Sequence, residues 1–393
     1  MTDDRITALQ PEGSGQSAPT EIDASGQLVL PAFVNVHLHL DKTRLGDRMP
    51  YDRTGTLQDG LEQTWPLKRA YTVEDIQARA SEVLNTAIVH GAGFIRGFAD
   101  IDPMGGLTGV DALLGLRERY SSRLQYQVAA FTQEALFRHD GTLEHLEEAV
   151  RRGVDVIAGC PQIERSADLV RKHVETCFEL ATANDLDLHF LADDTDDPAA
   201  RSLEIITDCT EDAGWQGRVI VGHVGALSAY DHPHAVEVIR RVVDAGVVVC
   251  TNPQISLVLM GREDRGAVRR GTTRVSELLA AGARVIAAQD DVDDPYYPFG
   301  IPSQLEVAKY TAHVAHLSHP AGLDTVLDMV TTEAAKAVGL EAYGLEPGAD
   351  ADFNVFTVDR VSEALRLAPA PRWVVHRGVV TATTETTTWL RTE

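Results

Sequence analysis

The stretch Leu-Val-Leu-Pro-Ala-Phe-Val-Asn-Val-His-Leu-His-Leu-Asp, residues 28–41, decides the fold and the candidate site of this chain. Its apolar run predicts a buried β-strand that ends at two histidines, His37 and His39. Side chains two residues apart face the same side of a strand, so both imidazoles point the same way. Because histidine is the commonest metal ligand, the pair predicts a metal site at the strand's carboxyl end. The alternative is a half-buried strand whose histidines bind no metal.

Seven further short apolar runs follow, and longer amphipathic stretches separate them. The runs cover residues 93–100, 124–131, 155–160, 187–191, 218–223, 247–251 and 284–289. The amphipathic stretches include residues 74–90, 142–152, 166–184, 198–213 and 233–245. Eight strands alternating with helices predict a closed parallel α/β barrel. An open doubly wound sheet would also alternate, but no GxGxxG or Walker sequence follows a strand, so no nucleotide cofactor is indicated.

Polar or ionisable residues stand at the ends of several predicted strands. They are Asp100, Gln133 with Glu134, Asp193 with Asp194, His223, Asn252, and Gln289 with Asp290 and Asp291. In a barrel, the carboxyl ends of the strands meet on one rim, where active sites are built. A single aspartate there could instead cap the following helix. Eight strands that converge on one rim favour a shared site.

The two ends of the chain differ from its middle. Residues 351–381 alternate like small strands, and residues 1–30 hold a short Ile-Thr-Ala-Leu run before a Gly/Ser-rich stretch. We therefore expect residues 1–30 and 342–393 to pair into a small β-domain. The barrel would then occupy residues 31–341.

Composition excludes several classes of partner. The formal net charge of −24 argues against a polyanion such as nucleic acid. No apolar stretch approaches the roughly 20 residues that a membrane span needs. The four cysteines are scattered and form no CxxC pair, and no secretory signal is present. We therefore expect reduced thiols in a cytoplasmic protein.

The eighth predicted strand leads into Gln-Asp-Asp-Val-Asp-Asp-Pro-Tyr-Tyr-Pro, residues 289–298. The adjacent carboxylates of Asp290 and Asp291 suit both metal ligation and proton transfer. The alternative is a helix N-cap followed by a loop that proline ends.

These segments together resemble the amidohydrolase superfamily and, within it, the cytosine deaminase branch. The resemblance runs from about Leu28 to Gly348. It rests on Leu-Pro-x-Phe-Val-x-x-His-Leu-His-Leu-Asp (30–41), Gly-Thr-Leu (55–57), Phe-Thr-Gln-Glu (131–134), Asp-Asp-Thr-Asp-Asp (193–197), Gly-His (222–223), Thr-Asn-Pro (251–253), Arg-Arg-Gly-x-Thr-Arg-Val (269–275) and Asp-Asp-Val-x-Asp-Pro-x-Tyr-Pro (290–298). It implies a distorted (β/α)8 TIM barrel, with a small β-sandwich formed by both termini. It also implies one divalent metal ion (Zn, Fe or Mn) and a homo-oligomer.

The resemblance implies a role for each matched residue. His37, His39 and Asp290 would hold the metal, and Asp290 would also take a proton from the attacking water. His223 would orient that water and support the developing negative charge.

The resemblance implies four further roles around the substrate. Gln133 would hold a ring amide, and Tyr296 would cover the substrate. Asp291 would face the leaving amine. Asp194 stands where the family has a glutamate that shuttles a proton.

The chain departs from the family pattern at the fifth predicted strand. An ungapped match places Leu191 where the family has a metal-binding histidine. Three protein ligands would remain, which is still enough for zinc, although the ion would be weakly held. His223 could swing in as a fourth ligand. We interpret His189, roughly 6–7 Å further down the strand, as a core residue, with ligation of a deeper ion as the alternative.

We therefore predict a metal-dependent hydrolase of C–N bonds in a small polar N-heterocycle, most simply a deaminase of a cytosine-like or other cyclic amidine. One alternative is a non-hydrolytic enzyme on the same barrel, with weak or absent metal, that carries out an elimination, cyclisation or isomerisation. Leu191 is its main support. A catalytically silent binding protein is a third reading, but several polar groups retained at one rim argue against it. Lys42 and Arg44 could bind an acidic substrate group or lie in a solvated loop.

Overall fold

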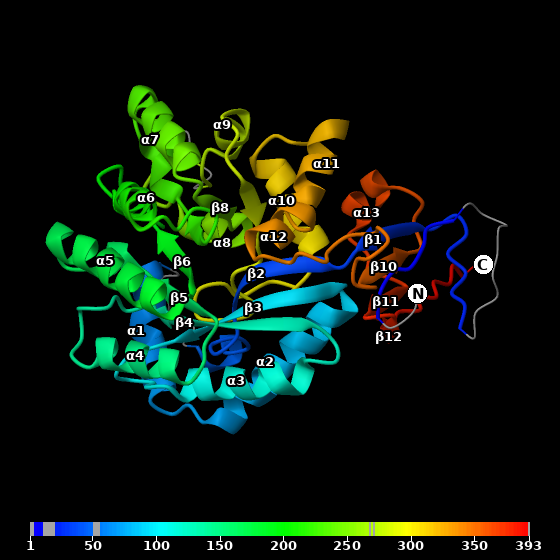
Figure 1. Ribbon diagram of the computed structural model, residues 1–393, viewed down its shortest axis with the longest axis horizontal. Coiled ribbons are helices and arrows are strands. Elements are labelled where there is room, and N and C mark those ends of the chain that lie inside the picture. The colour runs from blue at the N-terminus through cyan, green and yellow to red at the C-terminus, as the bar shows by residue number, and fades with distance from the viewer. Residues whose placement is uncertain (1–3, 11–19, 50–55, 267–268, 270–271, 392–393) are drawn as a thin grey trace.

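Eight parallel strands and the helices between them build the body of the protein (Figure 1). The computed structural model describes residues 4–10, 20–49, 56–266, 269 and 272–391. Each barrel strand pairs with the next in the order β2-β3-β4-β5-β6-β7-β8-β9. The strands are β2 (Phe33–His39), β3 (Ala92–Asp100), β4 (Gln125–Thr132), β5 (Val156–Gly159), β6 (Asp187–Ala192), β7 (Val219–His223), β8 (Val248–Thr251) and β9 (Val285–Ala287). A parallel bridge between Leu38 and Asp290 joins the first strand to the segment after the last.

The helices surround this barrel, which confirms the predicted (β/α)8 architecture. They are α1 (Leu57–Lys68), α2 (Val73–Val89), α3 (Thr108–Tyr120), α4 (Thr142–Arg151), α5 (Ala167–Asn184), α6 (Ser202–Ala213), α7 (His232–Asp244), α8 (Pro253–Leu259), α9 (Val275–Ala280), α10 (Gln304–Val314), α11 (Pro320–Asp328), α12 (Thr332–Ala337) and α13 (Val361–Leu367). The described residues also form three short 3₁₀ helices, η1 (Gly46–Arg48), η2 (Pro161–Ile163) and η3 (Gly225–Ala229).

Local sequence explains where these helices begin and which face they bury. The Thr72 side chain accepts a hydrogen bond from the Asp75 amide at the start of α2, and Ser166 does the same for the Leu169 amide at α5. Each contact satisfies one of the four amides that a helix start leaves unpaired. The apolar face of α2 is fully buried in the core, because its apolar residues recur at helical spacing.

Both ends of the chain contribute to a second, antiparallel sheet, which lies beside the barrel (Figure 1). Its order is β1 (Leu28–Pro31), β10 (Phe353–Phe356), β11 (Trp373–His376) and β12 (Val379–Thr383). The apolar run predicted as one strand is therefore divided at Ala32. The part before Ala32 pairs with β10, and the part after it opens the barrel.

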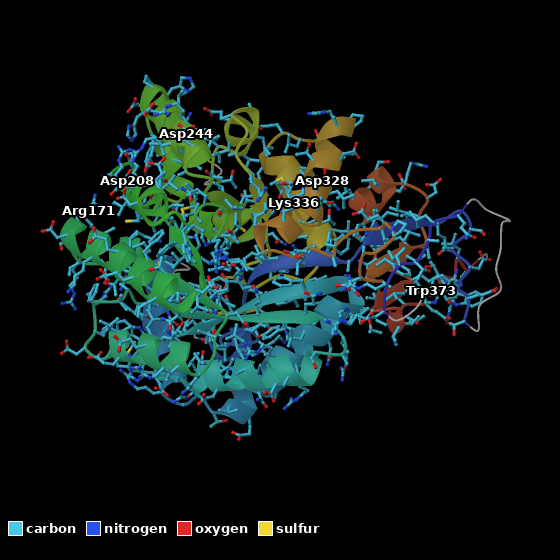
Figure 2. All side chains as sticks on the ribbon, viewed as in Figure 1. Arg171, Asp208, Asp244, Asp328, Lys336 and Trp373 are labelled. Carbon is cyan, nitrogen blue, oxygen red and sulfur yellow. The ribbon has the colours of Figure 1, made fainter. Side chains whose placement is uncertain are left out.

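Charged side chains cover the outer helices (Figure 2). Asp208 on α6 pairs with Arg241 on α7, and Arg171 on α5 lies near Glu175. None of the helices in the described ranges is long and apolar enough to cross a membrane. All four cysteines are free thiols, as expected, and Cys160, Cys177 and Cys250 are buried.

Candidate active site

Three possible metal ligands converge at the carboxyl end of the barrel. β2 carries His37 and His39, and Asp290 follows β9. The Nε2 atoms of the two histidines lie 3.2 Å apart. The Asp290 Oδ1 atom lies 3.3 Å from the His37 Nε2 atom and 3.2 Å from the His39 Nε2 atom. All three side chains are buried.

This triangle fits a divalent ion. Nitrogen and oxygen ligands about 2.0–2.2 Å from a tetrahedral ion stand roughly 3.3–3.6 Å from one another, which is close to the spacings here. A neutral imidazole with its hydrogen on Nδ1 presents a lone pair at Nε2, and a carboxylate oxygen only accepts, so each of the three facing atoms can serve as a ligand to a cation. A cation between the three atoms would satisfy all of them. The His37 ring is also held in place, because it stacks on Phe98 with 4.2 Å between ring centroids.

The backbone is strained at the strand ends that form this rim. Asp290 has φ 75°, His223 has φ 64° and the β-branched Val224 has φ 52°. Such left-handed conformations are uncommon outside glycine and are costly for a β-branched residue. They persist where the surrounding structure enforces them, and they cluster at active sites.

His223 links two carboxylates on the rim. Its Nε2 atom lies 3.3 Å from Asp290 Oδ2, and its Nδ1 atom lies 3.3 Å from Asp194 Oδ1. Burial opposes the ionisation of Asp290, but His223 and His39 outweigh it and lower the pKa of Asp290 on balance. Burial raises the pKa of Asp194, and the charge of Asp290 adds to the rise. The rim therefore pairs a carboxylate that ionises readily with one that holds its proton more firmly.

Asp291 is the third acid of this rim. Burial raises the pKa of Asp291 well above its ordinary value, and the neighbouring charges of Asp294 and Asp290 raise it further. Asp294 is fixed from the other side, because its Oδ1 atom accepts hydrogen bonds from the Tyr296 and Tyr297 amides, each at 2.9 Å. Asp291 therefore keeps its proton to a higher pH than an ordinary aspartate does. By contrast, the Asp193 carboxylate accepts hydrogen bonds from the Ser202 and Leu203 amides at the start of α6.

A small cavity lies against these groups. Its lining residues are His39, Lys42, Leu57, Gln133, Cys160, Leu191, Asp194, His223, Ile255, Leu259, Asp290, Asp291 and Tyr296. The open space is about 20 Å³, which is enough for a water molecule but not for a ring. Leu57 from α1, Leu259 from α8 and Tyr296 pack in one apolar cluster with Leu61 beside it. This cover must shift before a heterocycle can enter.

Lys42 is buried in this cavity wall, so the solvated-loop reading is wrong for this residue. Its Nζ atom donates hydrogen bonds to Asp100 Oδ1 at 2.7 Å and to Gln133 Oε1 at 3.0 Å. Burial opposes its charge, but Asp100 and Asp41 outweigh the burial and raise the pKa of Lys42. Arg44 does lie at the surface, where it pairs with Asp293 at 2.6 Å.

A second buried lysine extends this network. The Lys68 Nζ atom lies 2.8 Å from Asp100 Oδ2 and 2.6 Å from Asp102 Oδ2. Glu134 stands 3.7 Å from the same ammonium and accepts a hydrogen bond from the Trp65 indole at 3.0 Å. Sequence reasoning noted Asp100 and Glu134 as strand-end residues but missed Lys68. No local signal marks a lysine on a helix that reaches back into the barrel.

Leu191 and His189 lie on the same inner face of β6. Leu191 lines the cavity. His189 is fully buried one layer deeper, edge-on to His37 with 4.9 Å between ring centroids. Its Nδ1 atom lies 3.4 Å from a nitrogen of Arg96, a group that can only donate. The neutral ring then carries its hydrogen on Nε2, which does not suit that atom as a ligand.

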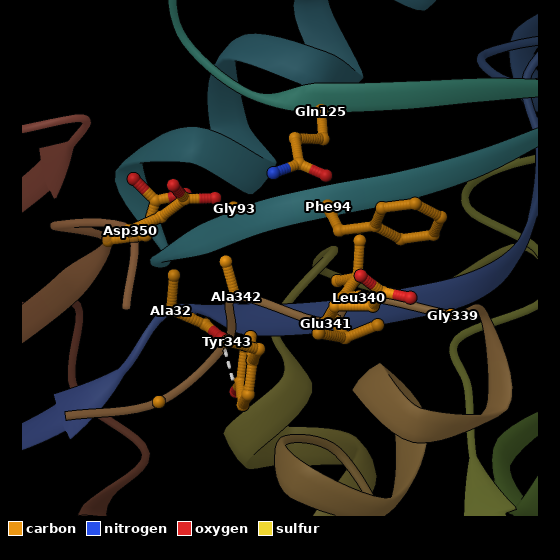
Figure 3. Close-up of a pocket in the computed structure, with 13 residues that line it drawn as sticks. Ala32, Gly93, Phe94, Gln125, Gly339, Leu340, Glu341, Ala342, Tyr343 and Asp350 are labelled. Carbon is orange, nitrogen blue, oxygen red and sulfur yellow. Dashed lines mark hydrogen bonds between the residues drawn. The ribbon is translucent and has the colours of Figure 1, made fainter. Parts of the chain in front are cut away.

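A separate hollow lies at the opposite end of the barrel (Figure 3). It holds about 310 Å³ and is lined by residues at the starts of barrel strands, such as Ala32, Gly93 and Gln125. The Tyr343 hydroxyl donates a hydrogen bond to the Ala32 carbonyl there at 2.7 Å. In this fold the amino-terminal end serves stability rather than catalysis, so the small cavity by the histidines is the candidate site.

A barrel with two histidines on its first strand and an aspartate after its last strand is typical of metal-dependent hydrolases. Comparison with known proteins points to the same class. The model of the amidohydrolase family (Amidohydro_3) matches residues 44–382, so the chain belongs to the amidohydrolase family. The 5-methylcytosine deaminase from Klebsiella pneumoniae, solved with 5-fluorocytosine, superposes with a TM-score of 0.94 at 30% identity. That match covers 100% of this chain and 95% of the other. The chain thus falls in the cytosine deaminase-like branch.

Two curated relatives are more distant in sequence. A pterin deaminase from Rhizobium rhizogenes is 27% identical over 97% of this chain and 86% of its own length. An N-isopropylammelide isopropyl amidohydrolase from Pseudomonas sp. (strain ADP) is 28% identical over 90% of this chain and 85% of its own length.

Proposed function

We propose that this protein is a metal-dependent aminohydrolase that releases an amine or ammonia from a small N-heterocycle. The observation that carries the proposal is the convergence of His37 Nε2, His39 Nε2 and Asp290 Oδ1 within 3.3 Å, beside a cavity that also presents Asp194, Asp291 and His223. The activities for which the relatives are named, on a pterin, a methylated cytosine and an ammelide, support a ring that bears an amino group as the substrate.

His37, His39 and Asp290 would hold one divalent ion, although its identity is open among Zn, Fe and Mn. When bound, such an ion lowers the pKa of a neighbouring water molecule. Asp290, whose pKa is lowered and whose other oxygen contacts His223, would be the ionised carboxylate that accepts a proton from the attacking water.

The remaining acids would complete the proton transfers. Asp194 would pass a proton to the ring nitrogen, since its raised pKa lets it carry one. Asp291, whose pKa burial raises well above normal, would hold a proton for the leaving amine. Gln133 and Tyr296 line the cavity and would position the ring. General acid–base steps of this kind contribute about 10²–10⁴ in rate each.

Metal analysis combined with an ammonia assay tests the proposal. Purified protein should contain about one divalent ion per chain, and it should release ammonia from at least one of cytosine, 5-methylcytosine, pterin and aminotriazines. His37→Ala and Asp290→Ala should lose both the ion and the activity. Asp208→Ala, on the outer face of α6, is the matched surface control and should lose neither. Protein that holds no ion under metal-replete conditions would contradict the proposal.

Leu191 supports a second candidate function, which is a non-hydrolytic reaction in the same barrel. An apolar side chain here leaves three ligands, and it presents a different shape to the substrate. Leu191→His distinguishes the two functions, with Leu191→Met as the control for shape. If the histidine tightens metal binding and creates deaminase activity that the parent lacks, the parent carries out another reaction.

A further inference from the structure

A larger pocket lies directly outside the candidate cavity, on the same carboxyl face of the barrel. This outer pocket holds about 770 Å³, and its walls are mainly the segments that follow β5, β6 and α8. Leu57, Asp194 and Leu259 line both spaces. Leu57 and Leu259 also belong to the apolar cover that must shift before a ring enters. Movement of that cover therefore joins the cavity to the outer pocket.

The outer pocket is lined by buried polar atoms that the described chain leaves without a hydrogen-bond partner. Glu164 is only 8% exposed, and its Oε1 atom accepts hydrogen bonds from the Leu136 and Phe137 amides, each at 2.9 Å. Its Oε2 atom has no partner within the described ranges, and the same holds for both amide atoms of Gln162 and for Asp196 Oδ1. Buried polar groups are normally hydrogen-bonded, so these atoms call for a further group. Three of them are oxygens that accept, and they suit a ligand that donates.

The charge of the lining selects against an anion. Acidic side chains outnumber arginines by six to three among the residues that line the outer pocket. Each arginine is also engaged elsewhere. Arg165 donates a hydrogen bond to a backbone carbonyl, and Arg201 and Arg269 pair with carboxylates at 3.3 Å and 2.7 Å. A negatively charged group would meet like charge here, which is a common way for a site to reject a wrong partner.

Apolar side chains complete the lining, among them Val170, Ile205 and Met260. A few placed polar groups in a largely apolar hollow of roughly 300–1,000 Å³ are typical of a small-molecule site. The outer pocket has both properties, whereas the cavity by the histidines holds only about 20 Å³.

We propose that the outer pocket is a substrate subsite: it binds a substituent of the ring that donates hydrogen bonds, such as a hydroxyalkyl chain, and it rejects an anionic substituent. Gln162 Oε1, Glu164 Oε2 and Asp196 Oδ1 accept the hydrogen bonds of that chain. Asp194, which lines both spaces, stands where the ring and its substituent meet. This inference rests on the proposed function and deepens it, because it describes the substrate as a heterocycle with a polar, uncharged or cationic side chain.

Two matched sets of ligands test the proposal. The first is pterin, neopterin, which adds a trihydroxypropyl chain, and pterin-6-carboxylate. The second is 5-methylcytosine, 5-hydroxymethylcytosine and 5-carboxycytosine. Binding to the metal-loaded protein is measured by calorimetry, and kcat/KM replaces Kd for any member that is turned over. In at least one set, the hydroxylated member should bind about 10-fold tighter than each of the other two.

Two substitutions assign this preference to the outer pocket. Gln162→Leu keeps the size of the side chain and removes its amide, so the advantage of the hydroxylated member over the parent ring should fall at least about threefold. Asp196→Asn keeps an oxygen for the Gly261 amide and removes the charge, so rejection of the carboxylate should weaken by a similar factor. Asp196→Asn also keeps the test valid if Gln162→Leu fails to fold.

Matched controls come from side chains that do not line the outer pocket. Gln58→Leu, at an exposed position of α1, and Asp208→Asn, on the outer face of α6, should change neither preference. None of the four substitutions touches a metal ligand. Binding of the parent rings should therefore stay within about threefold of wild type in every variant.

The outcomes separate this inference from the function on which it rests. A hydroxyl preference that Gln162→Leu reduces, without any ammonia release, supports the subsite and counts against the reaction. Ammonia release from the parent rings with no advantage for the hydroxylated members overturns the subsite alone. Tighter binding of the carboxylates, a hydroxyl preference unchanged in Gln162→Leu, or failure of every member to bind also overturns it.

Discussion

Asp194 lies against His223 on the cavity rim, and its proton can be removed by a single substitution. Asp194→Asn removes the proton that Asp194 would deliver and leaves the three metal ligands untouched. We expect kcat to fall about 10²–10⁴-fold with a smaller change in KM and an unchanged metal content. Asp194→Glu, which keeps an acid, is the control. An asparagine variant that retains kcat within about threefold would remove Asp194 from the mechanism.

Buried histidines give a second prediction at this scale. Burial lowers the pKa of His37 and His189 well below the ordinary value, and it also lowers the pKa of His173. The unfolded chain takes up these protons first, near pH 6.5, so stability is complete above that pH and is lost as the pH falls below it. Each group should remove up to about 1.4 kcal/mol of unfolding free energy per pH unit.

Urea unfolding of the chelator-treated protein between pH 7.5 and 5.5 measures this effect. His173→Gln should reduce the pH slope, because burial lowers the pKa of His173 in the folded protein. An unfolding free energy that is flat across this range would show that these histidines are not buried in their neutral form.

At the residue scale, the sequence predicted which side chains would lie close together wherever they stand at the ends of barrel strands. His37, His39, His223 and Asp290 come together because each stands at the end of a parallel strand, and parallel strand ends share one rim. Lys42 could not be placed, because a charged residue after a strand is usually solvated. Its burial depends on Asp100, which lies 58 residues away along the chain.

At the scale of elements, α1 forms part of the cover over the cavity. A methyl group on Gly60 of α1 would stand 2.6 Å from the Tyr296 ring, too close for any real contact. We expect Gly60→Ala to push α1 and Tyr296 apart, with a loss of about 1–3 kcal/mol in stability and a raised KM. Thermal melting and steady-state kinetics measure the two effects.

The control for this change is another helical glycine. Gly115→Ala in α3 would meet only the Gln77 side-chain amide, which can move away. It should therefore be neutral or stabilising by a few tenths to about 1 kcal/mol. Equal effects of both substitutions would mean that α1 does not depend on the close approach to Tyr296.

The barrel strands and main helices were predictable because their apolar periodicity is long and clear. The division of residues 28–39 at Ala32 was not, since both halves are apolar and only pairing with β10 or β3 separates them. α1 gives little signal either, because it carries Pro66 and exposes much of its length. Its helical form depends on the Thr56 cap and on packing over the cavity.

At the scale of the whole molecule, the homo-oligomer implied by the resemblance stays a prediction. Phe299 and Ile301 follow the loop that carries Tyr296, and 64% and 47% of their surfaces are exposed. Light scattering should give a mass of at least two chains of 42.7 kDa each. A single-chain mass at micromolar concentration would contradict the prediction.

The central claim is that His37 and His39, on the first barrel strand, and Asp290, after the last barrel strand, hold one cation. The most direct measurement is an anomalous diffraction map from crystals of the zinc-loaded protein. We predict one peak about 2.0–2.2 Å from His37 Nε2, His39 Nε2 and Asp290 Oδ1. A map with no peak there, with the two imidazoles turned away from Asp290, would contradict the account.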